Sequence, residues 1–181
     1  LNVLFQAGAD LDVANERGWH FSHELATKSA KLVKKILPHV SMAVNLPDGT
    51  TPLMVAIEKE NWEVVETLLD SDNSLRVYSV NDEGNTAAHM LAKAKQIQLL
   101  EKMIVSADDS YEAFLPNANG QKPFDFIENE DLRERIKEKV KAVQSEFNQS
   151  FLPDDTVVKS VVDEQPNIDV AVKAETNSDT A

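Results

Sequence analysis

A fourfold internal repeat is the feature that most constrains how this chain can fold. Three similar segments lie at residues 15–23, 45–53 and 81–89, and a weaker fourth lies at 117–124. Their glycines fall at positions 18, 49, 84 and 120, with spacings of 31, 35 and 36 residues. Self-similarity at about 20 to 50 residues is typical of stacked repeats, because one such unit cannot bury its own apolar face. The chain is therefore predicted to fold as a row of similar units.

Each copy is followed by the pattern of two helices. In the second copy, Thr51-Pro52 opens a helix with proline at its first position, where the missing N–H costs nothing. Apolar residues recur at helical spacing over 53–57, a polar break follows at 58–61, and a second apolar stripe covers 62–69. We predict equivalent helix pairs over about 25–37 and 88–104.

The residues of the second copy carry a family resemblance. The asparagine and Gly49, Thr51-Pro52-Leu53, a short helix, a polar turn, and a helix with paired valines and leucines together resemble the ankyrin repeat. The resemblance covers about Leu1 to Ile136, and the family period is 33 residues. The first copy departs from it at His20-Phe21-Ser22 and the third at Ala87-Ala88. Longer links are expected at 71–80 and 105–115.

The resemblance implies an all-α solenoid of stacked helix-turn-helix units. We divide the chain into a partial repeat at 1–14, repeats at about 15–44, 45–80 and 81–116, and a degenerate repeat with a capping helix at 117–149. Each glycine is expected to take a positive φ in a projecting turn, where a side chain would be strained. The resemblance also implies that His23 and His89 bond the turn of their own or the next repeat.

Residues 131–147 predict one long, charged helix that caps the stack. Leu132, Ile136, Val140, Val143 and Phe147 form its apolar stripe. A coiled-coil dimer is the alternative, although coiled coils usually need three or four sustained heptads. At the other end, Leu4 and Phe5 lack an upstream neighbour, and the chain is expected to be part of something longer.

Residues 150–181 differ from the rest in composition. They hold seven acids and two bases, a net charge of −5 out of −13 for the whole chain. Beyond Leu152 their apolar residues are short valine pairs and a few scattered small or branched side chains without a helical stripe, too little to offset the entropy of ordering the segment. We predict a disordered acidic tail whose deletion leaves stability unchanged; a docking or secretion role for it stays open.

No constellation of residues in the sequence predicts catalysis. There is no cysteine, no nucleophile elbow and no phosphate-binding glycine loop. His20 and His23 stand three residues apart, but a metal site would need further ligands. We therefore expect no enzyme activity, no metal and no cofactor. The acidic balance argues against nucleic acid and anionic membranes as partners.

Protein binding is the function that the resemblance implies, through a concave face made of turn tips and inner helices. Trp19 at the first tip is either a binding anchor or a packing residue across the neighbouring turn. The candidate partner-binding residues are Arg17, Trp19, Lys28, Asp48, Thr50, Lys59, Asp82, Glu83, Asn85 and Lys93.

We predict a scaffold or adaptor that is monomeric by itself and located in the cytoplasm. Two alternatives remain: a regulatory or targeting region of a larger enzyme or channel, and a secreted effector of an intracellular bacterium that binds a host protein. The full upstream sequence would separate them, since an enzyme or membrane domain there would select the first alternative.

Overall fold

The described part of the chain consists of helices and loops, as the sequence predicts. The computed structural model describes residues 10–11, 13–71, 75–106 and 110–150. Within them, the β-structure is limited to one isolated bridge between Ala14 and His20. The N-terminal residues Leu4 and Phe5 and the predicted tail beyond Ser150 lie outside the described residues. Residues 1–149 and 150–181 form separate units.

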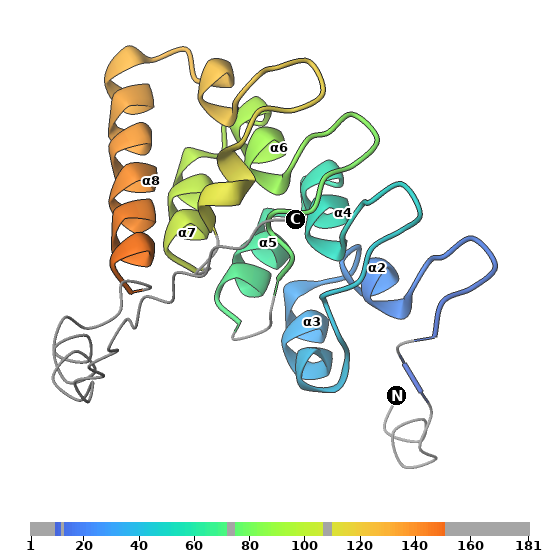
Figure 1. Cartoon of the computed structure of the whole chain (residues 1–181). Helices are drawn as coiled ribbons and strands as arrows, with labels where there is room; N and C mark the ends of the chain where they lie inside the picture. The colour runs from blue at the N-terminus through green and yellow to red at the C-terminus, as the bar shows by residue number, and fades with distance from the viewer. Residues whose placement is uncertain (1–9, 12, 72–74, 107–109, 151–181) are drawn as a thin grey trace, which may run out of the picture. The chain divides into compact units, whose positions relative to one another are not determined.

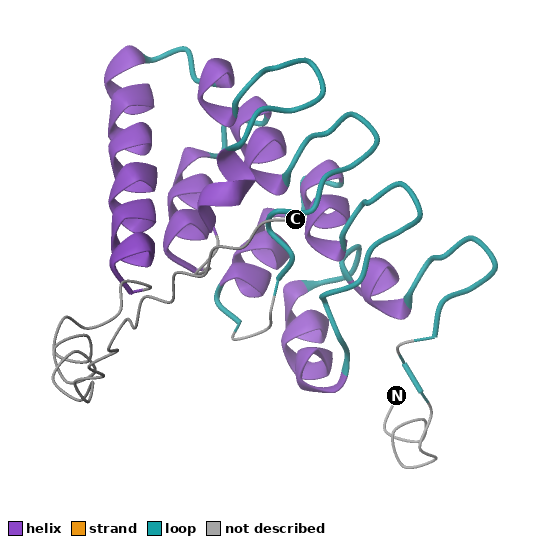
Figure 2. Ribbon diagram, viewed as in Figure 1, coloured by secondary structure: helices purple, strands orange, loops and turns teal. Residues whose placement is uncertain are grey.

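The helices alternate between two layers (Figures 1 and 2). The inner layer holds α2 (Phe21–Leu25), α4 (Pro52–Glu58) and α6 (Ala87–Lys93), which pack against one another in that order. The outer layer holds α3 (Ala30–Ile36), α5 (Trp62–Leu69) and α7 (Ile97–Ser106). Three short 3₁₀ helices follow α3 and α7: η1 (Leu37–His39) comes after α3, and η2 (Ser110–Phe114) and η3 (Pro123–Phe126) come after α7.

The helix starts follow from local sequence. The Thr51 hydroxyl accepts the Met54 N–H at the start of α4, so that the proline at position 52 begins a capped helix. The helix-to-helix turns end in left-handed residues, Glu60 at φ 52° and Lys95 at φ 58°. In both turns the next backbone N–H bonds back to an inner-helix carbonyl, which is a typical way to satisfy the end of a helix.

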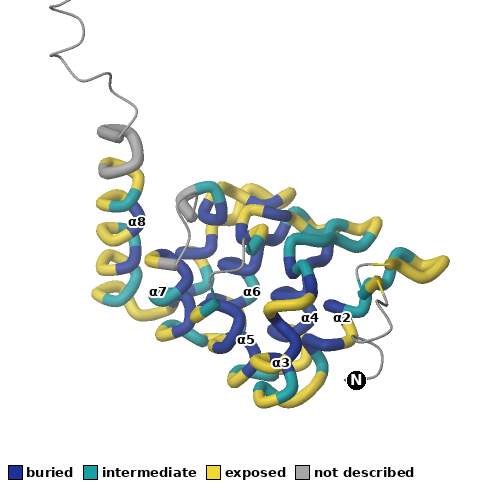
Figure 3. Tube along the Cα trace, turned by 90° about the horizontal axis from the view of Figure 1, so that it is seen from below, coloured by how far each residue is buried: buried dark blue, intermediate teal, exposed yellow. Residues whose placement is uncertain are grey.

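One apolar core runs between the two layers (Figure 3). Leu25, Met54, Leu68, Leu91 and Leu100 are essentially inaccessible to solvent, and they come from both layers of successive copies. Burial of this kind stabilises the fold by about 25 cal/mol for each Å² of apolar surface removed from water. Because each copy supplies only part of this core, stability depends on the stacking of neighbours.

The last copy differs from the others in its helices. Its inner helix is reduced to η3, and α8 (Glu130–Ser150) follows. Ile136 and Val140 are buried, and Arg135 reaches Glu101 of α7 at 2.6 Å. The remaining described faces of α8 are largely charged and exposed. The predicted long charged helix therefore exists, with bounds a few residues wider than 131–147.

Candidate functional site

Four projecting loops, which we call the tips, share one backbone geometry. They are residues 15–19, 46–50, 81–85 and 117–121 (Figure 1). In each, the first residue donates its N–H to the carbonyl of the fifth, and the glycine N–H donates to the carbonyl of the first. The glycines have φ values of 72° to 84°, a region that side chains oppose. The repeated glycine is therefore explained by the shape of the turn.

An asparagine at the first position braces three of the four tips from within. The Oδ1 atoms of Asn15, Asn81 and Asn117 each accept two backbone N–H groups of their own tip. In the second tip this position is Leu46, and Asp48 Oδ1 instead accepts the Thr50 N–H at 2.8 Å. The sequence alignment that began the second copy at Asn45 was therefore out of step by one residue.

His23 connects α2, and His89 connects α6, to the tip of the next copy, as the resemblance implied. Nδ1 of His89 accepts the Thr86 N–H at 3.1 Å, which leaves the proton on Nε2, 2.9 Å from the carbonyl oxygen of Gln121. His23 lies in the same way between the His20 N–H and the Thr50 carbonyl. Burial lowers the pKa of both imidazoles, so they stay neutral near pH 7.

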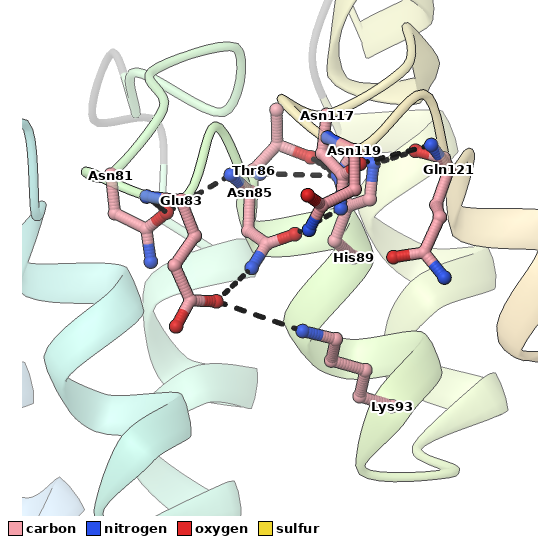
Figure 4. Close-up of polar contacts among 9 residues, drawn as sticks. All are labelled: Asn81, Glu83, Asn85, Thr86, His89, Lys93, Asn117, Asn119 and Gln121. Atoms are coloured by element: carbon pink, nitrogen blue, oxygen red, sulfur yellow. Dashed lines mark hydrogen bonds and ion pairs between the residues drawn. The ribbon is translucent and has the colours of Figure 1, made fainter.

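The third and fourth tips are joined by further buried polar contacts (Figure 4). Asn117 Nδ2 donates to Asn85 Oδ1 at 2.8 Å, and Asn85 Nδ2 donates to Glu83 at 2.6 Å. The Thr86 hydroxyl donates to the Ala113 carbonyl at 2.6 Å. Because these groups satisfy one another away from water, they hold the two tips in a single arrangement.

Most of the predicted partner-binding residues lie on one exposed surface, which we call the inner face. It comprises the tips and the solvent-facing side of α2, α4 and α6. Its exposed members from the prediction are Arg17, Lys28, Asp48, Lys59, Asp82, Glu83 and Lys93. Within this set, Lys93 lies next to Glu83, and the charges of Asp48, Lys59 and Glu83 are close enough to act on the Glu58 carboxyl.

Two predicted contact residues are buried, and their assignment to the binding surface is corrected. Thr50 is 7% exposed and Asn85 is 2% exposed. The Thr50 carbonyl faces His23 of the preceding copy, and the Asn85 side chain lies between Glu83 and Asn117. Both residues stand next to the tip glycine, where the chain turns back into the stack and away from solvent.

Trp19 is half-buried and packs against the apolar core. Its ring lies 5.3 Å from the His23 ring, centroid to centroid. The structure therefore supports the packing role for this side chain.

Charge on the inner face is mixed, with a local excess of carboxylates. Lys28 pairs with Glu24, and Lys93 lies 3.7 Å from Glu83 and 5.1 Å from the centre of the Phe126 ring. The Glu58 carboxyl lies on the same face. Partial burial raises its pKa, and the negative charges of Asp48 and Glu83 raise it further. The candidate partner-binding residues did not include Glu58, although it stands beside Lys59 at the end of an inner helix, and they did not include Phe126.

The chemistry of the described residues offers no assembled reaction centre. Within the described part of the chain, no group of three or more His, Asp or Glu side chains could hold a metal ion. Buried His23 and His89 have both ring nitrogens occupied by backbone groups. None of the described helices is long and apolar enough to cross a membrane.

Comparisons with known proteins agree with the repeat geometry. The model of the family of ankyrin repeats (three copies) matches residues 1–79 and 22–113. The chain belongs to the ankyrin-repeat family, whose members are generally protein-binding modules without catalysis. It is 30% identical over 98 residues to ankyrin repeat-containing protein YGL242C of Saccharomyces cerevisiae, a match that covers 50% of this chain and 52% of the yeast protein. The matched part thus spans about half the length of that relative.

Proposed function

We propose that this protein is a non-catalytic adaptor that binds a partner protein through its inner face. The observation that carries the proposal is that some residues of a tip hold its backbone while others expose charged side chains. In the third tip, Asn81 holds the backbone and Asn85 contacts the neighbouring tip, while Asp82 and Glu83 are exposed; the Glu83 carboxylate also accepts the Asn85 amide and lies near Lys93. A rigid base that presents exposed, variable side chains is well suited to recognition, because little ordering entropy is lost on binding.

The partner is expected to contact the charged side chains that border the tips. Lys28, Lys59 and Lys93 follow the tips on the inner helices, and Asp48 and Asp82 lie at the tips themselves. Exposed charges of this kind mainly set the association rate and the choice of partner. We place this binding activity in the cytoplasm, in keeping with the common intracellular location of ankyrin-repeat proteins.

A charge-reversal pair with a matched control tests the binding face. Asp48→Arg/Asp82→Arg alters two tips, and Glu63→Arg/Glu138→Arg makes the same change of net charge on exposed residues of α5 and α8. Proteins captured by the wild-type chain are identified by mass spectrometry, and each association is then measured with purified components. The tip pair should weaken the association and reduce the loss of affinity on adding salt, because the attraction that salt screens is gone. The control pair should leave both near the wild-type values. The opposite pattern would move the binding face to the outer layer.

A further inference from the structure

The junction between the second and third copies lacks the histidine bridge that joins the other copies. The fifth residue after the tip glycine is His23 in the first copy, Met54 in the second and His89 in the third. The two histidines reach the carbonyls of Thr50 and Gln121 in the next tip. Met54 is fully buried at the same place, and its thioether has no proton to donate. This junction is therefore packed by a flexible apolar side chain where the others have a directed hydrogen bond.

The polar contact just before the second and third tips is also weaker than the contact between the third and fourth tips. Asn45 Nδ2 donates to the Ser79 hydroxyl at 3.3 Å, against 2.8 Å for the Asn117 and Asn85 pair. Asn45 Oδ1 is buried without a hydrogen-bond partner among the described residues. A buried acceptor without a partner costs about 1–3 kcal/mol. The polar groups between the second and third copies are thus less completely hydrogen-bonded than those between the third and fourth copies.

The outer layer of the same junction is held by ion pairs. Lys102 of α7 lies 3.2 Å from Glu66 of α5 and 2.7 Å from Asp70, which ends α5. The hydrogen bond to Asp70 raises the pKa of Lys102, so this lysine stays charged throughout the physiological range. The ion pairs of the junction therefore lie on the side opposite to the tips.

We propose that this junction is a joint at which the stack opens on the tip side. The outer helices α5 and α7 stay linked, while the second and third tips separate. Copies one and two and copies three and four then reorient as two halves of the inner face. Among the described residues, the hydrogen bond that opening here breaks on the tip side is the one between Asn45 and Ser79. Opening between the third and fourth copies would instead break three hydrogen bonds together: His89 to Gln121, Asn117 to Asn85 and Thr86 to Ala113.

Spin-label distances test the joint in the full chain, which has no cysteine of its own. Labels on Asp48→Cys and Asp82→Cys span the joint, and labels on Asp82→Cys and Asn119→Cys span the next junction; all three sites are exposed. Position 82 is common to both pairs, so its local effect is shared. We expect a broader distance distribution for 48/82 than for 82/119.

Met54→His supplies the missing bridge and Met54→Leu is its matched control. A histidine at 54 would place Nδ1 near the Thr51 N–H and Nε2 near the Asn85 carbonyl, as His89 does one copy later. It should narrow the 48/82 distribution to the width of 82/119, while Met54→Leu should leave it broad. The proposal is overturned if the two wild-type distributions are equally wide, if Met54→His leaves the 48/82 width unchanged, or if Met54→Leu narrows it equally.

Discussion

Replacing a tip glycine by alanine separates the strain of the turn from the fit between neighbouring copies. Gly49 and Gly120 have similar conformations, with φ of 84° and 73°. A Cβ atom on Gly49 would lie 1.9 Å from the Val80 carbonyl oxygen of the next tip, whereas a Cβ on Gly120 would meet nothing within 4 Å. The two substitutions thus share the backbone cost and differ in the steric one.

The expected losses follow from these two terms. Alanine in the left-handed region costs about 1–2 kcal/mol, which is the whole effect at Gly120. At Gly49 the Val80 backbone must also shift, and overpacking of this kind adds typically about 1–3 kcal/mol. The change in the entropy of the unfolded chain is the same for both variants and cancels in the comparison. Because we propose that the second and third copies separate on the tip side, Val80 can move away from position 49, and the steric cost is expected near the lower end of this range.

Urea and thermal unfolding followed by circular dichroism measure the difference. For a unit of this size, each kcal/mol lowers the Tm by roughly 2–4 °C. Gly49→Ala should therefore unfold at least about 2 °C below Gly120→Ala, with an unchanged urea slope. Equal midpoints for the two variants would refute the reasoning, because they would mean that the second tip does not rest against Val80.

Three further outcomes are expected. Burial holds the pKa of His23 and His89 below the usual 6.5 in the folded state, so between the folded and unfolded pKa values the unfolded chain binds more protons. The free energy of unfolding should therefore be highest above about pH 6.5 and fall as the pH drops below it. His23→Asn/His89→Asn should reduce this dependence on pH, as measured by urea unfolding at pH 5–7.5. Asn117→Ala should cost about 2–3 kcal/mol, because it leaves buried N–H and Asn85 groups unpaired, whereas the exposed Asn119→Ala should change the unfolding midpoint little. Trp19→Ala should lower the midpoint by itself, since the ring packs on His23 and the core; an unchanged midpoint together with lost partner binding would restore the role of anchor.

The local signals of the sequence were sufficient for the helical layers and the turns. Glycine spacing, Thr51-Pro52 and the apolar stripes predicted the helices of the second and third copies and the approximate position of each tip, because these preferences depend on residues within one or two turns. The first inner helix is different: α2 covers Phe21–Leu25, ahead of the predicted start near residue 25. The capping helix was predicted for the same reason: the stripe that includes Ile136 and Val140 is written in consecutive turns. The bridging histidines came from family resemblance.

The neighbouring copy decided what the sequence alone left open. Whether Thr50 and Asn85 face solvent depends on His23 and Asn117, which lie 27 and 32 residues away and approach them when the copies stack. The alignment of the second tip at Leu46 depended on which backbone N–H closes the turn. The sequence by itself therefore determined the repeating unit, since its helices and turns follow from short-range preferences. Only the tertiary structure decided which tip residues are exposed and which are buried against a neighbouring copy, because that depends on how each copy covers the next.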